Sequence, residues 1–196
     1  SSAASDVYKR QIYMYLKKRR NMNNIELDEL RSKIDEIDKN LCQLIIERQS
    51  LASKIIDAKK GSFPFDPKRE EDLIKKLVNL GLDKFLVEKV WRQIISSNLS
   101  MQKIIKIGVA GNDDEIKSAY LAHFGNYFKT TYFSSVVSLL ASLEKQDIEL
   151  GFIDSQSIDK LKKQTEMRVN FDVIANVPLY KNINEKDYSI VKLKKE

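Results

Sequence analysis

ELDELRSKIDEIDKNLCQLIIERQSLASKIIDAKK, residues 26–60, is the stretch that decides the fold of the N-terminal part of this chain. Its apolar side chains recur at alternating steps of three and four, the heptad spacing of a helix with a continuous packing face: Leu27, Leu30, Ile34, Ile37, Leu41, Leu44, Leu51, Ile55 and Ala58. We predict one helix from about residue 25 to residue 60, about 50 Å long. A helix of this length needs partners along all of it.

Arg48 interrupts the apolar face of this helix. An isolated cation there is compatible with a polar residue that sets coiled-coil register, or with a side chain that reaches to the edge. Lys59 lies three turns further on and returns to nearly the same face, about 16 Å away. Two long cationic side chains at that separation can hold a small dianion between them.

Two further helices are predicted before residue 103. DPKREED, residues 66–72, begins the first, with Asp66 as its N-cap and Pro67 at its first position, which by themselves indicate only a solvated first turn. The later helix carries one stripe in which two amides follow three apolar residues: Val87, Trp91, Ile94, Asn98 and Gln102. Buried amides are costly without partners, so they are either satisfied within the fold or available to a ligand.

Residues 26–102 resemble the all-helical class of chorismate mutase. The resemblance rests on the arginines of ELR and ERQ, the lysine of AKK, the Asp-x-x-Arg-Glu pattern at residues 66–70, and a third helix that ends in glutamine. It implies a three-helix domain in an intertwined all-α dimer that converts chorismate to prephenate. The implied catalytic residues are Lys59, Gln102 and Glu70, and the implied substrate-binding residues are Arg31, Arg48, Asp66, Arg69 and Asn98.

The implied reaction is a pericyclic rearrangement, which needs no nucleophile, general base, metal or cofactor. Arg31 and Arg48 would clamp the carboxylates of the substrate, and Lys59 and Gln102 would donate to its ether oxygen. Glu70 would accept from its hydroxyl group. Asn98 stands where the family has a hydroxyl residue, and its amide can also donate to a carboxylate.

The spacing of the two arginines predicts a homodimer. Arg31 and Arg48 are about 25 Å apart along one helix and point about 100° away from each other. One small substrate therefore cannot touch both within one chain. If both bind it, Arg31 is donated to the partner's site across a two-fold axis.

The chain carries a net charge of +6, and residues 1–21 supply +5 of it through six Lys or Arg residues against one Asp. SSAASDVYKRQ resembles a translated sequencing adapter, so we expect residues 1–21 to be a non-native leader and Met22 the native start; a transit peptide is the alternative. The remainder gives no charge excess for nucleic acid or a membrane surface. With one cysteine, Cys42, and no apolar run of about 18 residues, we expect a cytoplasmic protein.

Residues 103–196 read as alternating strands and helices, which predicts a small α/β domain with a partly parallel sheet. Strands are expected in IIKIGVAG, YFKTTYF, IELGFID, FDVIANVPLY and YSIVKL, and helices in DDEIKSAYLAHF and SSVVSLLASLEKQ. The order resembles the first lobe of prephenate dehydratase. The Thr-Arg-Phe motif and a second lobe are missing, so we expect no dehydratase activity; a chain truncated after Glu196 is an alternative that stays open. GVAGND indicates a plain turn between strand and helix rather than an anion site.

Two alternatives to the mutase remain open. Isochorismate-pyruvate lyase shares the helical scaffold and a similar set of cations. A non-catalytic module for dimerisation or ligand sensing would keep the helices, but it gains nothing from a cation such as Arg48 in its packing face.

Overall fold

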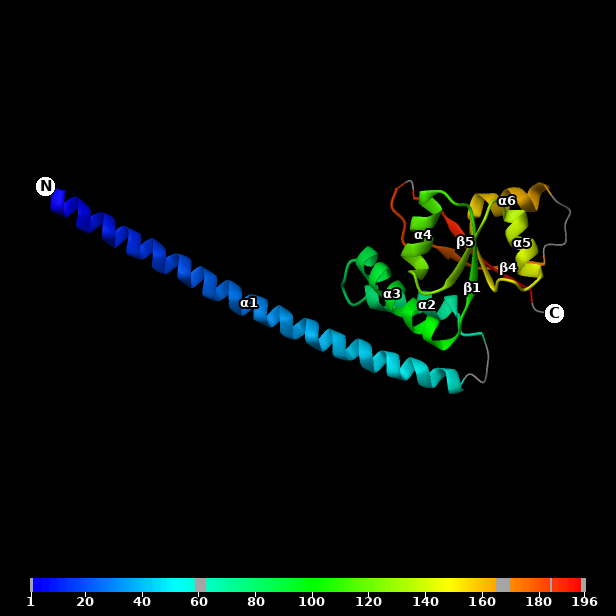
Figure 1. The fold of residues 1–196 in the computed structure, drawn as a ribbon, viewed down its shortest axis with the longest axis horizontal. Coiled ribbons are helices and arrows are strands. Elements are labelled where there is room, and N and C mark those ends of the chain that lie inside the picture. Colours follow the sequence, from blue (N-terminus) through cyan, green and yellow to red (C-terminus); the bar gives the residue numbers. More distant parts are fainter. Residues whose placement is uncertain (1, 59–62, 165–169, 184, 195–196) are drawn as a thin grey trace. The chain divides into compact units, whose positions relative to one another are not determined.

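The computed structural model describes the chain except residues 1, 59–62, 165–169, 184 and 195–196 (Figure 1). It divides into two compact units, Ser1–Ser50 and Leu51–Glu196, which we call the N-terminal and the C-terminal unit.

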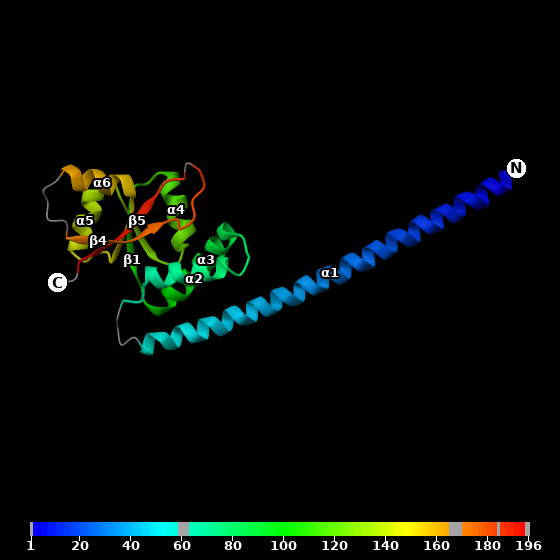
Figure 2. The same ribbon diagram turned by 180° about the vertical axis from the view of Figure 1, so that it is seen from behind.

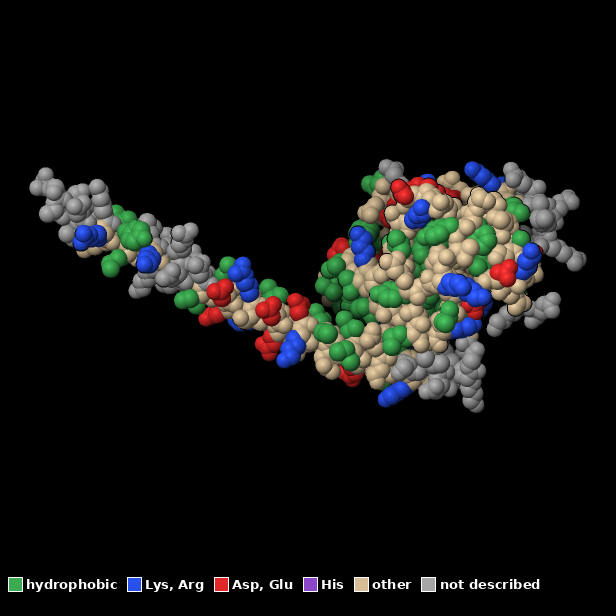
Figure 3. Space-filling view, viewed as in Figure 1, with side chains coloured by type: hydrophobic (Ala, Val, Ile, Leu, Met, Phe, Trp, Pro, Cys, Tyr) green, Lys and Arg blue, Asp and Glu red, His purple; other side chains and the backbone are tan. Residues whose placement is uncertain are grey.

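The N-terminal unit is formed by helix α1, which runs from Ser2 to Ala58 and continues into the C-terminal unit. It begins well before the predicted start near residue 25, because no Gly or Pro interrupts residues 2–58. The predicted apolar face is present and exposed, with Leu30, Ile34 and Leu44 each more than half accessible. Figure 3 shows such hydrophobic side chains between charged ones along this helix. No described helix has the length and apolar character needed to cross a membrane.

Helices α2 (Pro67–Val78) and α3 (Lys84–Gln102) form an antiparallel hairpin in the C-terminal unit. The predicted N-cap of α2 is confirmed, since Asp66 Oδ1 accepts from the backbone N–H of Arg69 at 3.1 Å and Pro67 occupies the first turn. Asp83 caps α3 in the same way, accepting from the N–H of Leu86 at 2.9 Å. Two short polar side chains therefore fix where the hairpin helices begin.

The α/β part is built on a five-stranded sheet of order β2-β1-β3-β5-β4. The strands are β1 (Lys106–Ala110), β2 (Lys129–Phe133), β3 (Leu150–Asp154), β4 (Phe171–Val177) and β5 (Tyr188–Leu193). Strand β1 pairs in parallel with β2 and β3, whereas β5 pairs antiparallel with β3 and β4. The prediction of an α/β layer with a partly parallel sheet is confirmed.

Helices cover both faces of the sheet (Figure 2). Helix α4 (Asp114–Phe124) contributes Ile116, Tyr120 and Phe124 to one core, which also takes in Phe65 and Leu99 from the helical region. Helices α5 (Val136–Glu144) and α6 (Ser155–Gln164) contribute to the second core on the other face. Helix α6 was not predicted, because its polar composition hides a short apolar stripe.

The two central parallel strands place glycines side by side, Gly108 on β1 and Gly151 on β3. A Cβ at Gly151 would lie 2.7 Å from Leu139 Cδ2 of α5, and one at Gly108 would lie 3.2 Å from Leu139 Cδ1. The missing side chains therefore allow α5 to approach the sheet closely.

Helix α3 packs against α4, so the helical hairpin and the α/β part share one compact unit. Ser96 Oγ donates to the carbonyl oxygen of His123 at 3.1 Å, and Gln93 Nε2 donates to the carbonyl oxygen of Ala122 at 3.2 Å. The change of secondary structure near residue 103 thus does not separate two independently packed bodies here. Domain boundaries at 21/22 and 102/103 remain a prediction from the sequence.

His123, the only histidine of the chain, is buried beside α3. Burial holds its pKa well below the ordinary value, and the charge of Arg92 lowers that pKa further. Histidine in the unfolded chain takes up a proton near pH 6.5, whereas His123 in the folded chain does not. The contribution of the neutral His123 to the free energy of unfolding is therefore complete above that pH and is lost as the pH falls. We expect the free energy of unfolding to fall below pH 6.5 by up to about 1.4 kcal/mol per pH unit.

Urea unfolding between pH 7.5 and 5.5, followed by Trp91 fluorescence, measures this effect. The His123→Gln variant should lack that part of the pH dependence. An equal slope in both proteins would contradict the assignment to His123.

Candidate functional site

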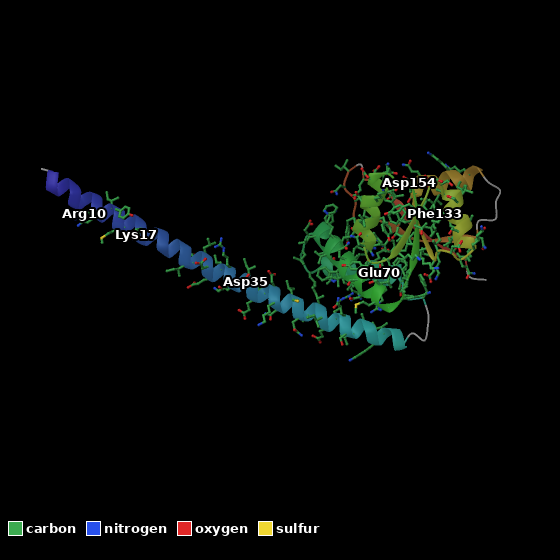
Figure 4. All side chains as sticks on the ribbon, in the orientation of Figure 1. Arg10, Lys17, Asp35, Glu70, Phe133 and Asp154 are labelled. Carbon is green, nitrogen blue, oxygen red and sulfur yellow. The ribbon has the colours of Figure 1, made fainter. Side chains whose placement is uncertain are left out.

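The first turn of α2 and the second half of α3 carry several of the predicted site residues. Glu70, labelled in Figure 4, accepts a hydrogen bond on Oε2 from Arg92 Nη1 at 2.9 Å. The side chains of this pair are 12% and 6% exposed, so the ion pair is largely removed from water.

Asn98 is the most unusual polar group of this region. It is buried, with only 4% of its surface exposed, and within the described part of the chain neither its Nδ2 nor its Oδ1 has a hydrogen-bond partner. A buried amide without partners costs about 1–3 kcal/mol. The sequence left open whether this amide is satisfied within the fold or available to a ligand, and no described group satisfies it.

Three other predicted residues lie on the same two helices. Gln102 is half-buried in the last turn of α3, on the stripe that carries Asn98. Asp66 and Arg69 are exposed at the start of α2, where Asp66 caps the helix. The hairpin therefore carries cationic, amide and carboxylate groups, and this combination suits a polar anionic ligand.

The remaining predicted residues belong to the N-terminal unit or lie outside the described residues. Arg31 lies in the N-terminal unit with an exposed side chain and pairs with Asp28 of the same helix at 3.4 Å. Arg48 is half-buried and also belongs to the N-terminal unit. Lys59 lies outside the described residues.

Sequence reasoning missed Arg92 and Glu88, two buried charged residues of α3. Burial lowers the pKa of Arg92, while the carboxylates of Glu70 and Glu88 oppose that shift. The one available signal was their spacing of four residues, which places both on one helix face. That spacing is common on solvated helices, and it gave no sign that both side chains are buried.

Residues 30–103 match the protein family described as chorismate mutase type II. A chorismate mutase of Methanocaldococcus jannaschii is 38% identical over 84 residues, which cover 40% of this chain and 85% of that protein. The matched region contains the helical hairpin and all of the predicted site residues.

Two longer relatives extend the match into the α/β part. A bifunctional chorismate mutase/prephenate dehydratase of Aquifex aeolicus is 30% identical over 138 residues, and one of Pseudomonas aeruginosa is 27% identical over 139 residues. Each alignment covers 65% of this chain but 38% of the relative, so the chain spans well under half of these proteins. No solved structure gives a significant match.

Proposed function

We propose, from the premise that this chain belongs to the chorismate mutase family, that it rearranges chorismate to prephenate at the site formed by α2 and α3. The single observation that carries this proposal is the buried amide of Asn98, which has no protein partner among the described residues and shares a helical stripe with Gln102. A ligand with hydrogen-bonding groups would satisfy an amide that the fold leaves unpaired.

The roles follow from the charge that develops as the ether bond breaks. Gln102 and Lys59 donate to the ether oxygen, where electrostatic stabilisation increases toward the transition state. Arg48 and the partner subunit's Arg31 hold the two carboxylates and keep the substrate in its reactive conformation. Glu70 accepts from the substrate hydroxyl, with Asp66 and Arg69 fixing the turn around it.

A homodimer is part of the proposal. The exposed apolar face of α1 repeats with heptad spacing over many turns, and a single helix of this length is not stable in water without burying such a face. A second copy of the chain supplies a matching face. The same assembly allows Arg31 of one chain to reach the site of the other.

The α/β part is not assigned dehydratase activity. Its relatives are named as bifunctional enzymes, but the alignments with them cover 38% of their length. We also propose a cytoplasmic location and no nucleic-acid or membrane partner, on the charge distribution and cysteine content of the chain. Cell fractionation of the tagged chain measures the location.

Incubation of the purified full chain with chorismate tests the function. We expect loss of chorismate absorbance with a matching amount of prephenate, and no salicylate when isochorismate is supplied instead. Salicylate formation from isochorismate would support the lyase alternative. A folded chain that converts neither compound would support the non-catalytic module.

Asn98 gives a prediction that separates stability from function. Asn98→Leu keeps a similar shape and removes two unpaired polar atoms, so we expect the free energy of unfolding to rise by about 1 kcal/mol. The same change should lower kcat/KM for chorismate at least about tenfold, because the substrate loses a hydrogen-bond partner. Urea unfolding and steady-state kinetics measure the two effects.

The buried Ser96, which donates to the α4 carbonyl of His123, provides the matched control. Ser96→Ala removes a made hydrogen bond and should therefore lose stability, the opposite direction from Asn98→Leu. A stability loss in Asn98→Leu as large as that in Ser96→Ala would show that the amide has a structural partner.

A further inference from the structure

Glu88 joins the helical hairpin to the α/β part through two hydrogen bonds. Its Oε1 accepts from the backbone N–H of Leu179 at 2.7 Å, and its Oε2 accepts from that of Tyr180 at 2.9 Å. Both N–H groups belong to the segment between β4 and β5, and Glu88 is 7% exposed. Hydrogen bonds to an ionised carboxylate are stronger than neutral ones, so this residue fixes α3 against the segment.

Arg92 follows Glu88 by four residues and continues the connection toward α2. Its guanidinium donates to Glu70 at 2.9 Å, and the charges of both Glu70 and Glu88 act on it. Glu88 and Arg92 lie one turn apart on α3, and we call these two side chains together with Glu70 the Glu88–Arg92–Glu70 network. It begins at the backbone of residues 179–180 and ends at the carboxylate proposed to contact the substrate.

The other bonds between α3 and α4 hold the same face of α3. Gln93 and Ser96 donate to the carbonyl oxygens of Leu121, Ala122 and His123 at the end of α4. Asn98 and Gln102 lie beyond this attachment, toward the end of the helix. The α/β part therefore sets the position of the helix from which the substrate-contacting amides project.

We propose that residues 103–196 act as a support for the mutase site, in which Glu88 and Arg92 are positioning residues that hold the carboxylate of Glu70. This inference rests on the proposed function for its catalytic consequence. Arginine suits the role because its planar fork holds a carboxylate in a defined orientation, which a single amine does less well. Small displacements of a group that contacts the substrate lower the rate strongly.

Steady-state kinetics of full-length variants test the catalytic consequence. Glu88→Gln keeps the shape of the side chain and weakens both bonds to residues 179–180, so kcat for chorismate should fall about tenfold. Arg92→Gln should reduce kcat further, and Arg92→Lys should recover part of the loss. Lys89→Gln, which alters an exposed neighbour of Glu88, serves as the matched control and should keep the kcat of the unmodified chain.

Combining variants at Glu88 and Glu70 distinguishes a positioning role of Glu88 from a purely structural one. If Glu88 acts through Glu70, Glu88→Gln should have almost no further effect on kcat in a Glu70→Gln background. Additive losses in the double variant would overturn the proposal. So would a folded Glu88→Gln variant with the kcat of the unmodified chain.

A second measurement does not depend on turnover. Urea unfolding of the Glu70→Gln, Glu88→Gln and double variants, followed by the single tryptophan Trp91, should give a combined stability loss smaller than the two single losses added together. Strictly additive losses would show that Arg92 does not link the two acids. An unmodified chain that fails to convert chorismate would refute the proposed function, while this cycle would still decide whether the network exists.

Discussion

Gln102→Ala and Lys59→Ala are each expected to lower kcat/KM for chorismate by at least about a hundredfold, equivalent to about 3 kcal/mol of transition-state stabilisation. Each change removes a proposed donor to the ether oxygen, whose negative charge grows as the carbon–oxygen bond breaks. The contact is therefore stronger in the transition state than in the bound substrate, and most of the loss should appear in kcat. Steady-state kinetics with circular dichroism of each variant measure the effect.

Two exposed neighbours provide controls for this prediction. Met101 precedes Gln102 on α3 and is 61% exposed, and Lys54 is exposed on α1. Met101→Ala and Lys54→Ala should retain nearly full activity. Near-normal turnover by folded Lys59→Ala or Gln102→Ala would refute the proposed role of the donor pair.

Arg31→Ala and Arg48→Ala should each be almost inactive as purified proteins, yet a mixture of the two should regain activity. In the proposed homodimer both sites of each variant carry a lesion, because Arg31 is proposed to serve the partner's substrate and Arg48 the substrate of its own chain. After subunit exchange, half of the dimers are mixed at equal concentrations, and each mixed dimer has one intact site of two. Activity should approach about a quarter of that of the unmodified chain.

Native mass spectrometry confirms the exchange of subunits in this experiment. Lys33→Ala, an exposed change close to Arg31 on α1, is the control and should be active without mixing. Two inactive proteins that remain inactive after confirmed exchange would refute the shared site. An active Arg31→Ala variant would remove Arg31 from the site altogether.

Local signals in the sequence determined most of the fold. The heptad spacing of α1, the Asp66 and Pro67 pair at the start of α2, and the alternation of strands and helices after residue 103 each act over a few residues, and the structure confirms all three elements. Spacing along one helix also placed Asn98 and Gln102 on a common stripe. Helix α6 was missed because ten mostly polar residues carry too weak a periodic signal.

The sequence also determined the family, since the order of cationic and amide groups in residues 26–102 is specific enough to match chorismate mutases. It did not determine the assignment of Arg31 and Arg48 to one site, which remains a prediction. The two arginines lie on one helix and point apart, so one small substrate could contact both only if a second chain supplied one of them. No pattern within a single chain shows such an arrangement.

Only the tertiary structure showed that Arg92 holds Glu70 and that Glu88 holds the backbone of residues 179–180. The partners of these bonds are 22, 91 and 92 residues apart along the chain. A charged residue on a helix usually faces water, and local sequence gives no reason to expect otherwise. Burial of Glu88 and Arg92 follows from the packing of α3 against the α/β part, where removal from water makes each charge depend on a partner that folding brings close.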